Sequence, residues 1–318
     1  MEKKIPVRGR FAPSPSGRMH LGNLWSCLLA WLAARSCSGE MVLRLEDLDP
    51  DRCRPAFCDQ VMRDLEWLGL DWDGEPVYQS RRTEAYAQAF RALEAQGLVY
   101  PCFCTRAERL TASAPHRSDG TALYDGRCRS LTPAEREVLA RTRRPAWRIH
   151  APEETVLFSD LLQGVVSEQL AQDDFILRRS DGVYAYQLAV VVDDAAMGVT
   201  QVVRGSDLLS STPRQLWLQQ QLRLPHPEYA HVPLLLAPDG RRLAKRDRDL
   251  ELGQLQEVYT APELVGRLAH AAGLLPEYRP VSPRELLPLF SWDRVPKRDM
   301  VLSLDTPSSG AEAAQGTP

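Results

Sequence analysis

One segment near the N-terminus restricts the fold more than any other: RFAPSPSGRMHLGNL, from Arg10 to Leu24. The residues before it, Val7–Phe11, predict a short strand, and GNLWSCLLAWLAARSCS, from Gly22 to Ser38, predicts a largely buried helix. A strand, a turn rich in proline and glycine and then a helix direct backbone N–H groups and the positive helix end toward one point. The segment therefore predicts an anion site in which His20 and Asn23 face the same ligand. The alternative is a tight turn with a surface histidine.

The residues that follow extend this pattern into a parallel α/β sheet. MVLRLED, Met41–Asp47, predicts a second strand with an acidic end, and two amphipathic helical stretches follow, DRCRPAFCDQVMRDLEWLGL and SRRTEAYAQAFRALEAQGL. The order strand, helix, strand is typical of a parallel sheet, whose ligands gather at the carboxyl ends of the strands.

The remaining chain divides by composition. From Tyr100 to about Ile149 it is rich in arginine, cysteine and turn residues, which predicts an inserted subdomain. Gly182–Gly205 is predicted to be rich in β-structure, HVPLLLAP to be one buried strand, and STPRQLWLQQQLRL and APELVGRLAHAAGLL to be helices. We predict a disordered tail and the following divisions: 1–99, 100–150, 151–250, 251–304 and 305–318.

Composition narrows the class of protein. The chain has 318 residues and a net charge of −3, so the whole chain does not carry the basic excess of many nucleic-acid-binding proteins. No stretch approaches the ~18 consecutive apolar residues of a membrane span, and MEKKIPVRGRF lacks the apolar region of a secretory signal. Seven cysteines without such a signal indicate reduced thiols and a cytoplasmic location.

A second feature suits a phosphate ligand. PDGRRLAKRDRDL, Pro238–Leu250, carries four arginines and Lys245 after an apolar run and a glycine. A lysine on such a loop can close over a polyphosphate as a compact charge. A solvated hairpin tip is the alternative.

A third feature suits a metal. CFC, Cys102–Cys104, and YDGRC, Tyr124–Cys128, together supply three thiols, which are compatible with structural zinc. On chemistry alone His116 is a candidate for the fourth ligand, since imidazole commonly binds zinc. An empty cluster of reduced cysteines is the alternative.

These features together resemble a class I aminoacyl-tRNA synthetase of the glutamyl type. HLGN, His20–Asn23, stands where that class has its HIGH signature, and RLAKR, Arg242–Arg246, stands where it has KMSKS. RFAPSPSG has the form typical of glutamate enzymes. Three further blocks match in the same order: LRLEDLD (Leu43–Asp49), AYQLAVVVDD (Ala185–Asp194) and VVRGSDLLSSTPRQ (Val202–Gln215).

The resemblance implies a Rossmann-type α/β catalytic core, an inserted zinc-binding subdomain and a short helical C-terminal part. It implies that His20 and Lys245 are catalytic, and that Mg²⁺ arrives with ATP. The residues implied for ATP are Pro15, Gly17, His20, Gly22, Asn23 and Lys245. Those implied for glutamate are Arg10, Ala12, Ser14, Glu46, Tyr186 and Arg204. The zinc ligands implied are Cys102, Cys104, Tyr124 and Cys128, with the tyrosine in place of His116.

For Arg204, the resemblance implies a bidentate pair with the side-chain carboxylate of glutamate, which would also exclude glutamine. A surface salt bridge with Asp207 is the alternative. Asp193 and Asp194 are expected to follow a buried strand and to have a structural or substrate-orienting role rather than to hold a metal.

Length refines the resemblance. About 68 residues follow Leu250, so we expect the anticodon-reading domain of larger glutamyl enzymes to be absent. The chain is then similar to the shortened glutamyl-Q tRNA(Asp) synthetases, which attach glutamate to the queuosine base of tRNA(Asp). Expected partners are ATP, L-glutamate and that tRNA, which RTRR, Arg141–Arg144, is expected to help bind. We expect a monomer that does not associate with a membrane. The alternatives are a truncated glutamyl-tRNA synthetase, a small-molecule adenylyltransferase and a catalytically silent paralogue, the last favoured by Asn23 and Ala244 in the two signatures.

Overall fold

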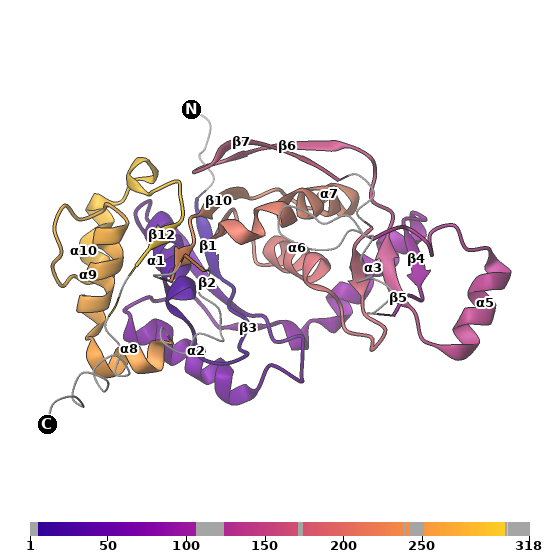
Figure 1. The fold of residues 1–318 in the computed structure, drawn as a ribbon, viewed down its shortest axis with the longest axis horizontal. Coiled ribbons are helices and arrows are strands. Elements are labelled where there is room, and N and C mark those ends of the chain that lie inside the picture. The colour runs from indigo at the N-terminus through magenta and orange to yellow at the C-terminus, as the bar shows by residue number, and fades with distance from the viewer. Residues whose placement is uncertain are drawn as a thin grey trace, which may run out of the picture.

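The computed structural model describes residues 6–105, 124–170, 174–237, 240–241, 251–302 and 304. Its centre is a parallel sheet, shown in indigo in Figure 1. The first three strands pair in the order β1 (Arg8–Phe11), β2 (Glu40–Leu45) and β3 (Val77–Tyr78). The crossovers contain α1 (Leu21–Arg35) and α2 (Pro55–Trp67). The predicted strand, loop, helix and second strand are therefore confirmed.

The second half of the chain forms a separate sheet that lies next to β1. β9 (Gln201–Gly205) lies beside β1, where the Thr200 N–H donates to the Arg8 carbonyl at 2.9 Å. β10 (Glu228–Val232) pairs in parallel with β9 and, at Tyr229, with β6 (Thr155–Asp160). β6 forms a hairpin with β7 (Gly164–Gln169). The helices of this half are α6 (Tyr186–Ala196) and α7 (Thr212–Leu222).

Two predicted elements of this half are wrong. The middle of Gly182–Gly205 is the helix α6, 11 residues long, and only its last residues form the strand β9. α6 is buried on several sides because it packs against α7 and α3 (Thr83–Ala95), so its apolar run lacks the polar face that identifies a helix. HVPLLLAP is also not one strand: Pro233 separates β10 from β11 (Leu235–Leu236), since proline has no N–H for the sheet.

The predicted insertion contributes two of the three strands of a small antiparallel sheet at one end of the molecule (Figure 1). Its strands are β4 (Val99–Cys102), β5 (Ala146–Ile149) and β8 (Ile176–Arg178), in the order β4-β5-β8. α5 (Pro133–Thr142) extends from it behind a capping box of Thr132 and Glu135.

The C-terminal residues pack at the opposite end, drawn in orange and yellow in Figure 1. They form α8 (Leu252–Val258), α9 (Ala261–Ala271), α10 (Pro283–Leu286) and β12 (Met300–Val301), which pairs with β11. Their apolar side chains share one core with α1 and β1, so this helical part is packed onto the half that contains the first parallel sheet. Short 3₁₀ turns occupy Gln79–Arg81, Ser206–Ser211, Leu287–Leu289 and Trp292–Arg294. The predicted tail, 305–318, lies outside the described residues.

Among the residues described, no helix has the length and apolar character that crossing a membrane requires.

Candidate active site

A cavity of about 760 Å³ opens at the carboxyl ends of β1, β2 and β9. It is the place where parallel sheets bind ligands. The predicted glutamate and ATP residues that line it are Arg10, Ala12, Ser14, Gly17, His20, Gly22, Asn23, Glu46, Tyr186 and Arg204. Pro15 belongs to the same loop but is buried and is not among the lining residues. Lys245 lies outside the described residues.

The loop after β1 ends in a hydrogen-bonded turn at the N-terminus of α1. The His20 N–H donates to Oδ1 of Asn23 at 3.3 Å, and the Asn23 N–H donates to the His20 carbonyl at 2.8 Å. Gly22 lets the imidazole lie against this turn, because a Cβ there would be 3.2 Å from two ring atoms of His20. Asn23 therefore organises the helix start, and the first turn of α1 has no acidic residue to repel an anion.

The loop is also fixed from the C-terminal side. The Leu252 N–H donates to the Met19 carbonyl at 3.0 Å, and a backbone bridge joins His20 to Glu251. The residue that follows the predicted phosphate-binding segment in the chain thus lies next to His20.

Below the cavity lies a buried network of charges. Arg44 is fully buried, and its guanidinium contacts Asp194 at 2.6 Å and Glu46 at 3.1 Å. Burial lowers the pKa of Arg44, but the attraction of Asp194, Glu46 and Asp193 outweighs it and raises the pKa overall. Burial raises the pKa of Glu46, against the lowering effects of Arg44 and Arg10. The network therefore fixes Glu46 in the cavity wall beside two cations.

Asp193 and Asp194 come from α6 and not from the end of a strand, which corrects the prediction. Asp193 accepts from Gln79 and from the hydroxyl of Tyr86, both at 2.7 Å, and from Arg82 at 2.5 Å. Its oxygens are therefore used within the protein, in keeping with the expected structural role.

Arg10 and Arg204 are the two buried cations that reach the cavity. Arg10 donates to the Val203 carbonyl at 3.0 Å, and its Nε makes no hydrogen bond within the described part of the chain. Burial lowers the pKa of Arg10, with Asp194 at 3.6 Å acting in the opposite direction.

Neutral groups surround Arg204. Its guanidinium donates to Thr212 at 2.7 Å, to Gln215 at 2.8 Å and to Tyr186 at 3.4 Å. Its Nε lies 3.0 Å from Nε2 of His231. Among the described residues no carboxylate lies within 4.0 Å of it, so the alternative of a salt bridge with Asp207 does not hold here. A buried guanidinium in this state is suited to an anionic ligand.

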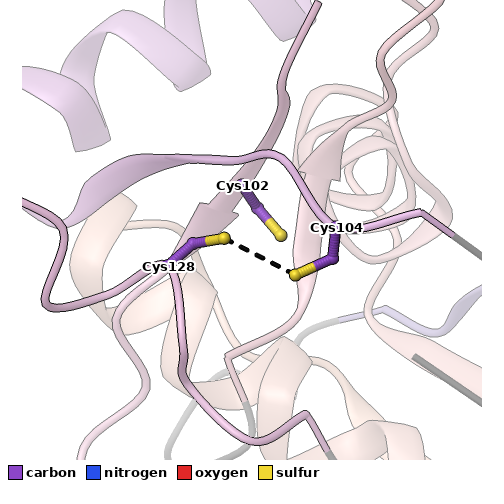
Figure 2. Close-up of side chains that lie close together, drawn as sticks. All are labelled: Cys102, Cys104 and Cys128. Carbon is purple, nitrogen blue, oxygen red and sulfur yellow. Dashed lines mark hydrogen bonds between the residues drawn. The ribbon is translucent and has the colours of Figure 1, made fainter. Parts of the chain in front are cut away.

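The three predicted thiols form a compact cluster (Figure 2). The sulfur atoms of Cys102, Cys104 and Cys128 lie within 4.8 Å of one another, and Sγ of Cys104 is 3.5 Å from Sγ of Cys128. The hydroxyl of Tyr124 lies 3.6 Å from Sγ of Cys102 and 3.8 Å from Sγ of Cys104. Tetrahedral zinc with Zn–S bonds of about 2.3 Å separates its sulfur ligands by roughly 3.8 Å. The donor set therefore fits zinc, with the tyrosine oxygen in the fourth position. His116 lies outside the described residues.

Arg148 adds a positive charge to this cluster. Its Nε lies 3.3 Å from Sγ of Cys102, and its guanidinium lies 3.8 Å above the ring of Tyr124. Burial raises the pKa of Cys102, but Arg148 and further hydrogen bonds outweigh this and lower it overall. Burial raises the pKa of Cys104 to about 12.

Sequence reasoning missed Arg44, His231 and Asp160. The acidic end predicted for the second strand indicated this region. Arg44 lies just before that end, and nothing distinguished it from the other charged residues nearby. Asp160 and His231 are 71 residues apart and carried no local signal.

The fold and the cavity define a class of protein: residues 6–275 match the catalytic domain of class I tRNA synthetases (E and Q). The chain belongs to that family. The glutamyl-Q tRNA(Asp) synthetase of Nitratidesulfovibrio vulgaris is 49% identical over 312 residues, which are 94% of this chain and 96% of the relative. The enzyme of that name from Symbiobacterium thermophilum is 48% identical over the same shares.

The solved structures agree on the fold. Glutamate-tRNA synthetase from Elizabethkingia anophelis has a TM-score of 0.81 at 28% identity, over 94% of this chain and 68% of that chain. A glutamate tRNA ligase from Elizabethkingia meningosepticum, in complex with its amino acid, has a TM-score of 0.80 at 28% identity, over 94% and 67%. The predicted class I catalytic core is confirmed.

Proposed function

We propose that this chain is a ligase that activates L-glutamate with ATP and transfers it to the queuosine base at the wobble position of tRNA(Asp). The single observation that carries the choice of amino acid is Arg204, a buried cation in the cavity wall whose described partners are all neutral. The tRNA target is supported by sequence identity of 42–49% to proteins named glutamyl-Q tRNA(Asp) synthetase.

In the proposed pocket, Arg204 binds the side-chain carboxylate of glutamate, and Tyr186 and Arg10 contribute further donors. Glu46 accepts from the α-ammonium, while Ala12 and Ser14 lie along the amino acid. Glutamine is excluded because its amide would place donors against the donors of Arg204.

The ATP site in this proposal is the turn into α1. His20, Asn23 and the backbone at Gly17 and Gly22 stabilise the phosphates, and Pro15 holds the loop. Lys245 supplies a further positive charge to the phosphates, and Mg²⁺ accompanies ATP.

The reaction needs no covalent attachment to the protein. An oxygen of the α-carboxylate of glutamate attacks the α-phosphorus of ATP, and the bond between that phosphorus and the pyrophosphate leaving group breaks. A hydroxyl oxygen of the queuosine cyclopentenediol then attacks the carbonyl carbon of glutamyl-adenylate, AMP leaves, and the hydroxyl proton passes to solvent. Positioning and charge stabilisation supply the acceleration.

Zinc in this proposal is structural: Cys102, Cys104, Tyr124 and Cys128 hold it and thereby tie the loop of 124–128 to β4. The tRNA contacts the surface at the C-terminal end of α5, where Arg141–Arg144 is exposed. A cytoplasmic monomer and the divisions 1–99, 100–150, 151–250, 251–304 and 305–318 remain predictions.

The test is transfer of labelled glutamate to purified tRNA(Asp) with and without queuosine, and to tRNA(Glu). The expected result is labelling of the queuosine-containing tRNA(Asp) alone. Labelling of tRNA(Glu) would instead identify a truncated glutamyl-tRNA synthetase. A companion assay, pyrophosphate exchange with glutamate and ATP, should proceed without tRNA. No exchange with or without tRNA would identify a catalytically silent paralogue.

A further inference from the structure

Arg204 is the first of a chain of three buried polar side chains, and the other two, His231 and Asp160, do not line the cavity. Nε of Arg204 lies 3.0 Å from Nε2 of His231, and Nδ1 of His231 lies 2.6 Å from Oδ2 of Asp160. His231 and Asp160 have no exposed side-chain surface. They come from β10 and from the end of β6, so the sheet register joins two residues that are far apart in sequence.

The chemistry of the two outer members fixes the state of the middle one. A guanidinium has only donors, so Nε2 of His231 must accept from Arg204. A carboxylate has only acceptors, so Nδ1 must carry the proton that it donates to Asp160. Thr212 fits the same assignment, because its oxygen accepts from Arg204 and its hydroxyl can donate to Nε2 of His231.

We propose that Asp160 and His231 are positioning residues that select the substrate amino acid: they hold the guanidinium of Arg204 toward the cavity without neutralising it. This inference rests on the proposed function for the identity of that amino acid. A carboxylate in direct contact with Arg204 would fix the side chain equally well, but it would compete with the carboxylate of the substrate. With the neutral imidazole of His231 in between, Asp160 orients Arg204 indirectly. The remaining N–H donors of Arg204 then stay available to the substrate.

The surroundings keep the imidazole neutral. The titratable or charged groups that face His231 are Asp160 from β6, Arg204 from β9 and, through its charge, Arg10 from β1. Tyr229, on the same strand β10, stacks on His231, with the ring centroids 5.9 Å apart and an angle of 10° between the ring planes. Burial, the largest cause, and the two arginines lower the pKa of His231 to about 4, against the raising effect of Asp160. Near neutral pH, Nε2 therefore remains an acceptor.

The test uses variants that change the tautomer or the reach of this side chain. In Asp160→Asn, the oxygen can keep the bonds from the backbone N–H groups of Leu162, Gln163 and His231, and the amide nitrogen then faces Nδ1 of His231. The proton is forced to Nε2, where it opposes the Nε–H of Arg204. In His231→Asn the amide reaches the place of Nδ1 but not that of Nε2, whereas His231→Gln can place an oxygen near Nε2.

The measurement is glutamate-dependent pyrophosphate exchange by the full chain. Asp160→Asn and His231→Asn should raise the KM for glutamate roughly ten- to a hundredfold, with kcat and the KM for ATP unchanged and with weaker discrimination against glutamine. His231→Gln should recover part of the loss. Tyr229→Phe is the matched control, because it removes a buried hydroxyl that contacts Gln219 but keeps the ring against His231. It should leave the KM for glutamate unchanged.

A second measurement is independent of turnover. The ¹⁵N shifts of the His231 ring should show the proton on Nδ1 in the parent chain and on Nε2 in Asp160→Asn. If the parent exchanges pyrophosphate but both variants keep its glutamate KM, the inference fails while the proposed function stands. An equal loss in kcat and in both KM values, or the same tautomer in both proteins, also overturns it. If the parent shows no exchange, the proposed function fails first.

Discussion

Lowering the pH from 7.5 to 5.0 should destabilise the folded chain through His231. This residue is fully buried, and its pKa falls from an ordinary 6.5 to about 4 because burial and the charge of Arg204 outweigh the attraction of Asp160. In the unfolded chain the imidazole takes up a proton as the pH falls below about 6.5. In the folded chain it does so only near pH 4.

Between these two pKa values the unfolded chain binds more protons, so the folded state loses stability as the pH falls through that window. At roughly 1.36 kcal/mol for each pKa unit, the free energy of unfolding should be about 2 kcal/mol lower at pH 5.0 than at pH 7.5 from this residue alone. Asp160 acts in the same direction at lower pH. Burial raises its pKa, but the hydrogen bonds from His231 and from the backbone outweigh this and lower it overall.

The assay is guanidinium denaturation of the parent chain and of His231→Gln at both pH values. Comparing the two proteins cancels the other titrating groups, such as Glu46, whose raised pKa acts in the opposite direction. The parent should lose about 2 kcal/mol more than the variant on acidification. If the two proteins lose the same free energy within about 0.5 kcal/mol, the typical limit of such measurements, the reasoning is refuted.

Other predictions concern the charges and the metal. Asp194→Ala should lower the free energy of unfolding by about 3–5 kcal/mol, because it removes the nearest partner of the buried Arg44; a loss below 1 kcal/mol by urea denaturation would contradict this. Cys128→Ser should reduce bound zinc, measured by atomic emission, and its melting temperature should no longer respond to a chelator, whereas the control Cys37→Ser, at an exposed thiol, should match the parent. Arg144→Ala should weaken tRNA binding and reduce the slope of log affinity against log salt by about 1; an unchanged slope would remove this residue from the tRNA surface.

Local chemistry made parts of this molecule predictable. The loop after β1 and the cysteine cluster could be recognised from the sequence. Proline and glycine mark turns, and closely spaced cysteines are typical of metal sites or disulfides. α6 could not, because a helix buried on several sides loses its polar face, and its three consecutive valines are typical of a strand.

The missed residues share a different cause. Arg44 and the pair of Asp160 and His231 acquire their meaning only from partners that the sheet brings from distant parts of the chain. Nothing in the sequence around them indicates that a charge is buried. Successive side chains of a strand point to opposite faces of the sheet, and the sequence near these residues does not show which face is covered. Such contacts follow from topology, which local patterns determine only in outline.

Three of the buried arginines, those in and beneath the cavity wall, show how this topology gives different roles to one type of side chain. Arg44 has three carboxylates within 4.0 Å, those of Asp194, Glu46 and Asp193, so its charge is balanced within the protein and serves to fix Glu46 and Asp194. Arg10 has one carboxylate at a longer distance of 3.6 Å, and the partners of Arg204 among the described residues are all neutral. Compensation therefore decreases from Arg44, beneath the cavity, to Arg204, in its wall. Because an unbalanced buried charge is costly, the fold keeps it only where a ligand can balance it, and a substrate with a second carboxylate does so better than one with an amide.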